Sequence, residues 1–208
     1  GSVKDLDHFI DFYGTNAPTN IAAIFENGKV VKLPYGDLDM QKIKQHEDGT
    51  FAAALSNDGK VVVGYCKCSN FAYNYPCKWT RGANNEWKLE QLPLPDTYKY
   101  GLAINVSSDG RTIVGLAMEG GRAIACYWID GKCYTVNCKS EDDELAKMKQ
   151  MRMIDMSPNG KYFIFSLSSR SDYRLFDVEK GTYRILLTFE RNETMRVPTV
   201  ADNGDVFG

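Results

Sequence analysis

The stretch AINVSSDGRTIVG, residues 103–115, decides the fold. It places the turn signal Ser107-Ser108-Asp109-Gly110 between two short apolar runs. Asp-Gly supplies the positive backbone dihedral angles that a short hairpin turn requires. The stretch therefore predicts two antiparallel strands joined by a tight turn.

The same turn signal occurs at three other places in the chain. The further copies are SNDG at 56–59, SPNG at 157–160 and ADNG at 201–204. Their glycines recur about every 50 residues, and self-similarity at such a period is typical of propellers and solenoids. The chain is therefore expected to repeat one structural unit.

A second motif follows each of the first three signals. Trp79, Trp128 and Phe176 each precede a glycine turn of their own, and another strand-like run comes after that turn. One repeat thus predicts four short antiparallel strands, as in a propeller blade. Because the aromatic residue recurs at one position of the repeat, we expect it to be buried between blades.

The predicted fold is an all-β propeller of four-stranded antiparallel blades in a single domain over residues 1–208. The first and last repeats each contain half a blade. Two arrangements are open: a four-bladed ring closed by pairing of the two halves, or part of a larger propeller. The predicted repeats are 19–34 (half), 50–93, 101–137, 151–187 and 197–208 (half).

The repeats resemble the HAF-type extracellular repeats and related propellers of Bacteroidetes surface lipoproteins. The second copy carries the pattern Ala-x-x-x-Ser-x-Asp-Gly-x-x-x-Val-Gly, and the third copy departs from it at Asn159, Phe165 and Phe176. The resemblance implies a propeller in the bacterial envelope or outside the cell, with no defined catalytic residues; a cytoplasmic location also stays open. The matching positions are Ala52, Ser56, Asp58, Gly59, Val63, Gly64, Trp79 and Gly82, then Ala103, Ser107, Asp109, Gly110, Val114, Gly115, Ala125, Trp128 and Gly131.

Composition excludes several classes of partner. The 208 residues carry a net charge of -2, with Lys and Arg scattered among Asp and Glu. The chain therefore has no basic stripe of the kind that nucleic-acid binding needs. It also has no apolar run long enough for a transmembrane segment. Gly1-Ser2 resembles a cloning remnant, so a leader peptide would not be part of this sequence.

The six cysteines match no standard zinc module. We expect no metal site and no cofactor. In an oxidising compartment, Cys66 or Cys68 would pair with Cys77 as neighbours on adjacent strands. The alternative is that most of the cysteines act as small buried hydrophobic residues.

Five aromatic residues are the candidate ligand-binding residues. They fall in a loop and at the join between two repeats, where exposed aromatic side chains serve sugar or protein recognition. The predicted ligand is a protein or a carbohydrate. The alternative is that these side chains pack loops over the blades. The residues are Phe71, Tyr73, Tyr75, Tyr98 and Tyr100.

The sequence lacks the common catalytic motifs G-x-S-x-G, H-E-x-x-H and the P-loop. It therefore favours a non-enzymatic interaction or ligand-binding module over an enzyme. The alternative function is a carbohydrate-active hydrolase or lyase, whose carboxylates would converge at the propeller axis.

Overall fold

The computed structural model describes residues 20–35, 49–67, 74–136, 150–167, 173–187 and 198–208. Every regular element within these ranges is a β-strand. The sequence also predicts two short helical segments, 41–45 and 141–150. Both lie outside the described residues, except that Gln150 forms a β-bridge with Ala123.

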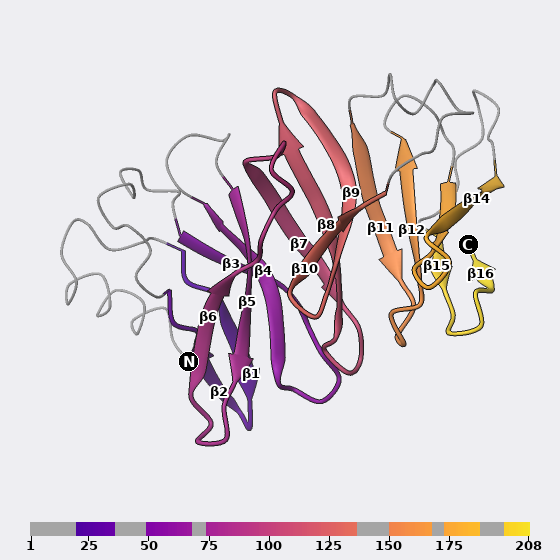
Figure 1. Cartoon of the computed structure of the whole chain (residues 1–208). Coiled ribbons are helices and arrows are strands. Elements are labelled where there is room, and N and C mark those ends of the chain that lie inside the picture. The colour runs from indigo at the N-terminus through magenta and orange to yellow at the C-terminus, as the bar shows by residue number, and fades with distance from the viewer. Residues whose placement is uncertain (1–19, 36–48, 68–73, 137–149, 168–172, 188–197) are drawn as a thin grey trace.

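Three four-stranded antiparallel sheets form the body of the molecule, as the repeats predict. In each sheet the strands pair in chain order, and the sheets stand side by side in a row (Figure 1). The first blade contains β3 (Gly49–Leu55), β4 (Val61–Lys67), β5 (Asn74–Arg81) and β6 (Trp87–Gln91). The second contains β7 (Tyr100–Val106), β8 (Thr112–Glu119), β9 (Arg122–Ile129) and β10 (Lys132–Thr135). The third contains β11 (Met151–Met156), β12 (Tyr162–Leu167), β13 (Tyr173–Asp177) and β14 (Thr182–Leu187).

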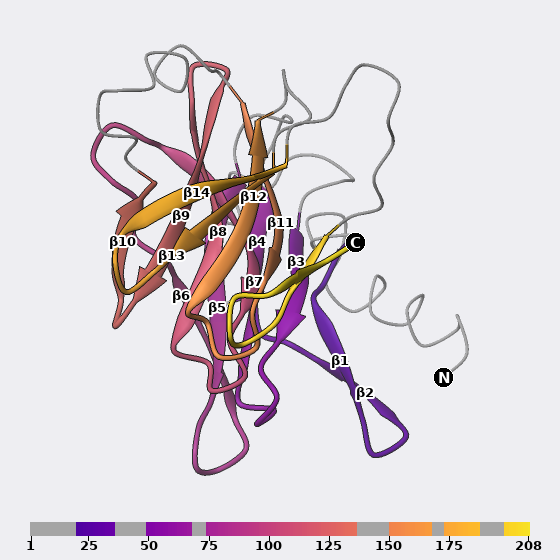
Figure 2. The ribbon, with the colours of Figure 1, turned by 90° about the vertical axis from the view of Figure 1, so that its right-hand side faces the viewer.

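Two shorter sheets flank the blades. The N-terminal pair is β1 (Ala23–Glu26) with β2 (Lys29–Lys32), and the C-terminal pair is β15 (Thr199–Val200) with β16 (Val206–Phe207). They lie at opposite ends of the row in Figure 1, and Figure 2 views the row from the end that holds the C-terminal pair. Of the two predicted arrangements, the ring closed by pairing of these halves is therefore not the one observed.

Packing against different blades keeps the two pairs apart. Ala22 and Leu33, which flank the N-terminal pair, share a buried cluster with Trp79 of the first blade. The C-terminal pair is held by the third blade, where Asp155 Oδ2 accepts hydrogen bonds from Thr199 Oγ1 at 2.6 Å and from the Val200 N–H at 3.0 Å.

The turn signal joins the first two strands of each blade through one hydrogen-bond pattern. In the second blade the buried Ser107 hydroxyl donates to Asp109 Oδ1 at 2.6 Å and accepts the Thr112 N–H at 2.9 Å. Asp109 Oδ1 also accepts the Arg111 N–H at 3.0 Å. Ser56 and Asp58 make the same contacts in the first blade, and Ser157 and Asn159 in the third. The turn role predicted for these residues is confirmed.

These inner turns also bind the blades to one another. The Asn57 N–H donates to the Ser108 carbonyl at 3.1 Å, and the Ser108 N–H donates to the Pro158 carbonyl at 2.7 Å. Proline has no backbone N–H, so in the third turn Asn159 donates instead, to Asp202 Oδ1 at 2.7 Å. The turns therefore form a continuous row from the first blade to the C-terminal pair.

The recurring aromatic residues are buried, as the sequence predicts. The indole N–H of Trp79 donates to the Pro34 carbonyl at 2.6 Å, and that of Trp128 donates to the Pro93 carbonyl at the same distance. Each tryptophan thus contacts the chain that ends the preceding sheet. A buried indole without such a partner would be unfavourable, so the repeated bond fixes how neighbouring blades sit.

The described cysteines are thiols within the blades. Cys66 and Cys77 are buried with their Sγ atoms 3.5 Å apart. The structure thus places one of the predicted cysteine pairs side by side, but as two thiols and without a disulfide bond. Burial, with Cys66 beside it, raises the pKa of the Cys77 thiol. This environment fits the alternative of small buried hydrophobic residues. Cys68 and Cys138 lie outside the described residues.

We predict that Gly160→Ala destabilises the fold more than Gly181→Ala. Both glycines have positive φ, +71° and +65°, so each substitution strains the backbone by about 1–2 kcal/mol. A Cβ at Gly160 would also lie 2.7 Å from Thr112 Cβ of the second blade, whereas one at Gly181 meets nothing within 4 Å. Overpacking adds about 1–3 kcal/mol. Urea unfolding of both variants measures the free energy of unfolding that each substitution removes. Equal losses of this free energy would contradict the contact between the inner turns.

We also predict that Asp109→Asn reduces the acid sensitivity of the fold. The Ser107 hydroxyl holds the pKa of Asp109 below its ordinary value of 3.8. A lowered folded-state pKa contributes stability above the unfolded-state pKa of about 3.9, and this is lost as pH falls through the folded value. Asparagine keeps the acceptor without the charge, as Asn159 does.

The measurement for Asp109→Asn is the melting temperature at neutral pH and at acidic pH. The variant should be less stable than the wild type at neutral pH, because it lacks the charge-assisted contribution of Asp109, and the difference between the two proteins should shrink in acid. An identical loss in acid for both proteins would contradict the prediction.

Candidate functional site

The structure describes three of the five predicted aromatic residues and brings two of them together. Phe71 and Tyr73 lie outside the described residues. The rings of Tyr75 and Tyr100 meet edge to face with centroids 6.1 Å apart. Tyr98 instead packs against the buried cluster between the first two blades. All three described tyrosines are half-buried, and the structure shows only two of them in contact.

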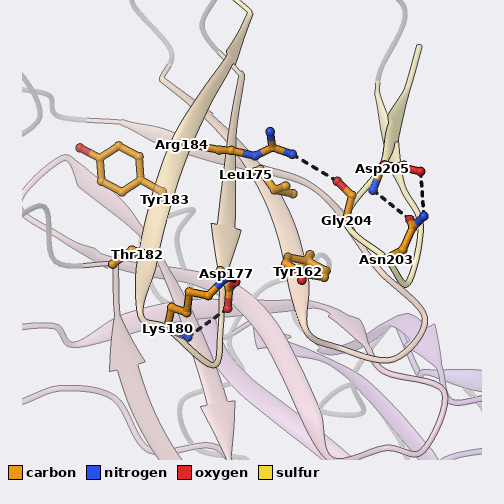
Figure 3. Close-up of a pocket in the computed structure, with 10 residues that line it drawn as sticks. All are labelled: Tyr162, Leu175, Asp177, Lys180, Thr182, Tyr183, Arg184, Asn203, Gly204 and Asp205. Carbon is orange, nitrogen blue, oxygen red and sulfur yellow. Dashed lines mark hydrogen bonds and ion pairs between the residues drawn. The ribbon is translucent and has the colours of Figure 1, made fainter.

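A groove between the third blade and the C-terminal pair is the candidate site (Figure 3). Its volume is about 320 Å³. Tyr162 and Leu175 supply its apolar surface, beside the buried Ile164 and Val200. Charged side chains from the β13–β14 hairpin and from the last inner turn surround this apolar surface. We call this feature the groove.

The β13–β14 hairpin places an ion pair at the groove. Asp177 ends β13 and Lys180 stands in the turn that follows. Lys180 donates its backbone N–H to Asp177 Oδ1 at 3.0 Å and its Nζ to Oδ2 at 2.9 Å. Burial opposes ionisation of Asp177, but the hydrogen bonds and charge of Lys180 outweigh it and lower the pKa of the carboxyl group. Asp177 is thus a carboxylate at neutral pH.

Arg184 and the last inner turn form the opposite side. Arg184 extends from β14 toward the turn, and its Nη2 lies 3.5 Å from the Gly204 carbonyl (Figure 3). An arginine carries five N–H donors, and this long contact involves one of them. In the turn, Asn203 Nδ2 donates to Asp205 Oδ2 at 2.7 Å, and the Asp205 N–H donates to Asn203 Oδ1 at 3.0 Å. The groove therefore presents both signs of charge.

Two other hollows lie between neighbouring sheets. One, of about 460 Å³, is lined by Tyr127, Phe176 and Tyr183. The other, of about 480 Å³, lies near Pro34 and Trp87. The first has no acidic residue in its lining, whereas the second also holds a basic and an acidic residue from two sheets, Lys32 and Glu86. Among the described residues no cluster of His, Cys, Asp and Glu could hold a metal ion.

Sequence reasoning missed the groove residues as a site. It used Lys180 and Asn203 only as turn residues, and it did not single out Asp177, Arg184 or Asp205. The spacing of Asp177 and Lys180 across a turn was the available signal for the ion pair. Arg184 and Asp205 line one groove only because one sheet packs on the next, and no local sequence pattern indicates that packing.

Comparisons with known proteins show the fold alone. Neither the protein-family models nor the curated proteins gave a match. Among solved structures, the putative TolB from Agrobacterium tumefaciens is 14% identical with a TM-score of 0.51, over 85% of this chain and 55% of that one. A chain from a study of two prolyl endopeptidases is 16% identical with a TM-score of 0.54, over 85% of this chain and 26% of that one.

TolB from Acinetobacter baumannii is also similar, at 18% identity and a TM-score of 0.47, over 76% of this chain and 36% of that one. This chain thus spans less than two thirds of each of these structures. At such identities the likeness concerns the arrangement of strands. The four-stranded antiparallel blades, together with the two neighbours whose TM-scores are 0.51 and 0.54, identify the fold as a β-propeller.

Proposed function

We propose that the protein is a non-enzymatic β-propeller interaction module that binds a protein segment in the groove. The observation that carries this proposal is the pairing of an apolar floor, Tyr162 and Leu175, with a charged rim formed by the Asp177–Lys180 pair, Arg184 and Asp205. Protein interfaces have this anatomy, an apolar centre inside a polar rim.

The strands beside the groove favour an extended protein segment over a small molecule. No described strand pairs with the outer edge of β16 or of β14. An exposed strand edge offers backbone N–H and C=O groups to an added strand, and neighbouring pockets then select its side chains. A segment lying along β14 would pair with these groups and run beside the groove at Arg184.

The proposed location is the bacterial cell envelope or the outside of the cell. It rests on the resemblance of the repeats to HAF-type extracellular repeats, and two structural neighbours are bacterial TolB proteins. The described residues contain no helix that is long and apolar enough to cross a membrane.

A phage-displayed peptide library tests the proposed function. The wild-type protein should enrich peptides, and Arg184→Glu should weaken their binding about tenfold or more, the loss typical of a charged hydrogen bond. Arg111→Glu is the matched control, because it reverses an exposed arginine on the second blade, away from the groove.

Failure to enrich any peptide, or equal binding by wild type and Arg184→Glu, would contradict the groove as the site. A panel of glycans distinguishes the proposed binding module from the alternative, a carbohydrate-active hydrolase or lyase. Release of a product from any of them would contradict the non-enzymatic assignment.

A further inference from the structure

Strand β14 presents a different surface on each of its two faces. Tyr183 pairs directly with Phe176, which packs toward the second blade. The next residue, Arg184, pairs directly with Leu175, which packs against the C-terminal pair. Directly paired residues share a face of a sheet, and successive residues alternate between the faces. Figure 3 shows the side chains of Tyr183 and Arg184 extending in opposite directions. One face of β14 is thus turned toward the second blade and the other toward the groove.

The face of β14 toward the second blade borders an aromatic hollow. This is the hollow of about 460 Å³ that Tyr127, Phe176 and Tyr183 line, and we call it the aromatic hollow. Ile185 lies on the same face, two residues beyond Tyr183, and is 52% exposed. An apolar or aromatic side chain suits a surface whose walls are aromatic and aliphatic.

The opposite face presents Arg184 to the groove. Its contact with the described residues is the long one to the Gly204 carbonyl, at 3.5 Å, and this engages one of its five N–H donors. The carboxylates beside it are already engaged: Asp177 accepts from Lys180, and Asp205 accepts a hydrogen bond within its own turn. Because an arginine and a carboxylate form charge-assisted, often bidentate hydrogen bonds, this face suits an acidic side chain.

We propose that the segment bound along β14 carries an acidic residue between two apolar residues. The segment adds to the edge of β14 as a further strand. Its Asp or Glu lies opposite Arg184, and its apolar neighbours lie opposite Tyr183 and Ile185. This inference rests on the proposed function and names the sequence class of the segment that the groove binds.

Strand geometry dictates this order of residues. In an added strand, a side chain directly opposite a residue of β14 lies on the same face, with the two Cβ atoms about 4.5–5.5 Å apart. The positions opposite residues 183–185 therefore point to the aromatic hollow, to the groove and to the hollow side again. The pattern reads the same from either end, so it holds whichever way the segment runs. A shift of one residue would instead direct the acid to the aromatic hollow.

Sequencing of the peptides selected from the phage-displayed library tests the pattern. The wild type should recover peptides in which Asp or Glu lies between two apolar residues. Selection on Arg184→Glu should replace that acid by Lys or Arg and keep the apolar neighbours, because only the groove face has changed. Arg111→Glu is the control and should recover the wild-type pattern.

A synthetic peptide with the selected pattern, measured by fluorescence anisotropy, tests the register. Replacing its acid by Gln should weaken binding about tenfold or more, the loss typical of a charged hydrogen bond. Exchanging the acid with one apolar neighbour keeps the composition and should weaken binding at least as much. Ile185→Glu in the protein should also weaken binding. Leu55→Glu, which changes an aliphatic residue of the first blade that is 47% exposed, is its control and should not.

Selected peptides that lack an acid between apolar residues would overturn the inference, as would recovery of the same acid by Arg184→Glu. Equal binding of the original and exchanged peptides would also overturn it. Far-UV circular dichroism must show that the variants fold, which their exposed positions favour. If the selected peptides lack the pattern but still need Arg184 for binding, this inference alone fails and the proposed function stands. A library that yields no binding peptide would overturn both.

Discussion

The hydrogen bonds between inner turns are the constraint on which the rest of the structure depends. The Ser108 N–H reaches the Pro158 carbonyl, and the Asn57 N–H reaches the Ser108 carbonyl. Each turn can present its backbone in this way only because its serine and its aspartate or asparagine satisfy the groups inside the turn. A tight turn thus serves both as the hairpin of one blade and as the joint to the next.

Burial of the recurring aromatics follows from that joint. Once the turns fix the spacing of neighbouring sheets, Trp79 and Trp128 fall on the chain that ends the preceding sheet and donate to its proline carbonyls. At the ends of the row the same geometry leaves Phe25 and Phe207 uncovered. The groove lies between the third blade and the C-terminal pair, where Tyr162 and Leu175 line it.

Local features of the sequence predict most of the fold. We could predict the Asp-Gly and Asn-Gly turns, the strands beside them and the buried tryptophans, because each of these features depends on residues that are close in the chain. The groove could not be predicted, because Arg184 approaches Gly204 only after two sheets pack. The candidate aromatics show the same limit: Tyr98 and Tyr100 are near in sequence, yet only Tyr100 contacts Tyr75. Which aromatic is exposed depends on the neighbouring sheet.

Hydrogen exchange of the turn amides, followed by NMR, tests most directly whether the turn row holds the blades together. If it does, the amides of Asn57 and Ser108 exchange only on global unfolding, with the same free energy as the strand amides of Val63 and Val114. The amide of Gly131, in an outer turn, provides the comparison. Exchange of Asn57 and Ser108 as fast as that of Gly131 would contradict the account.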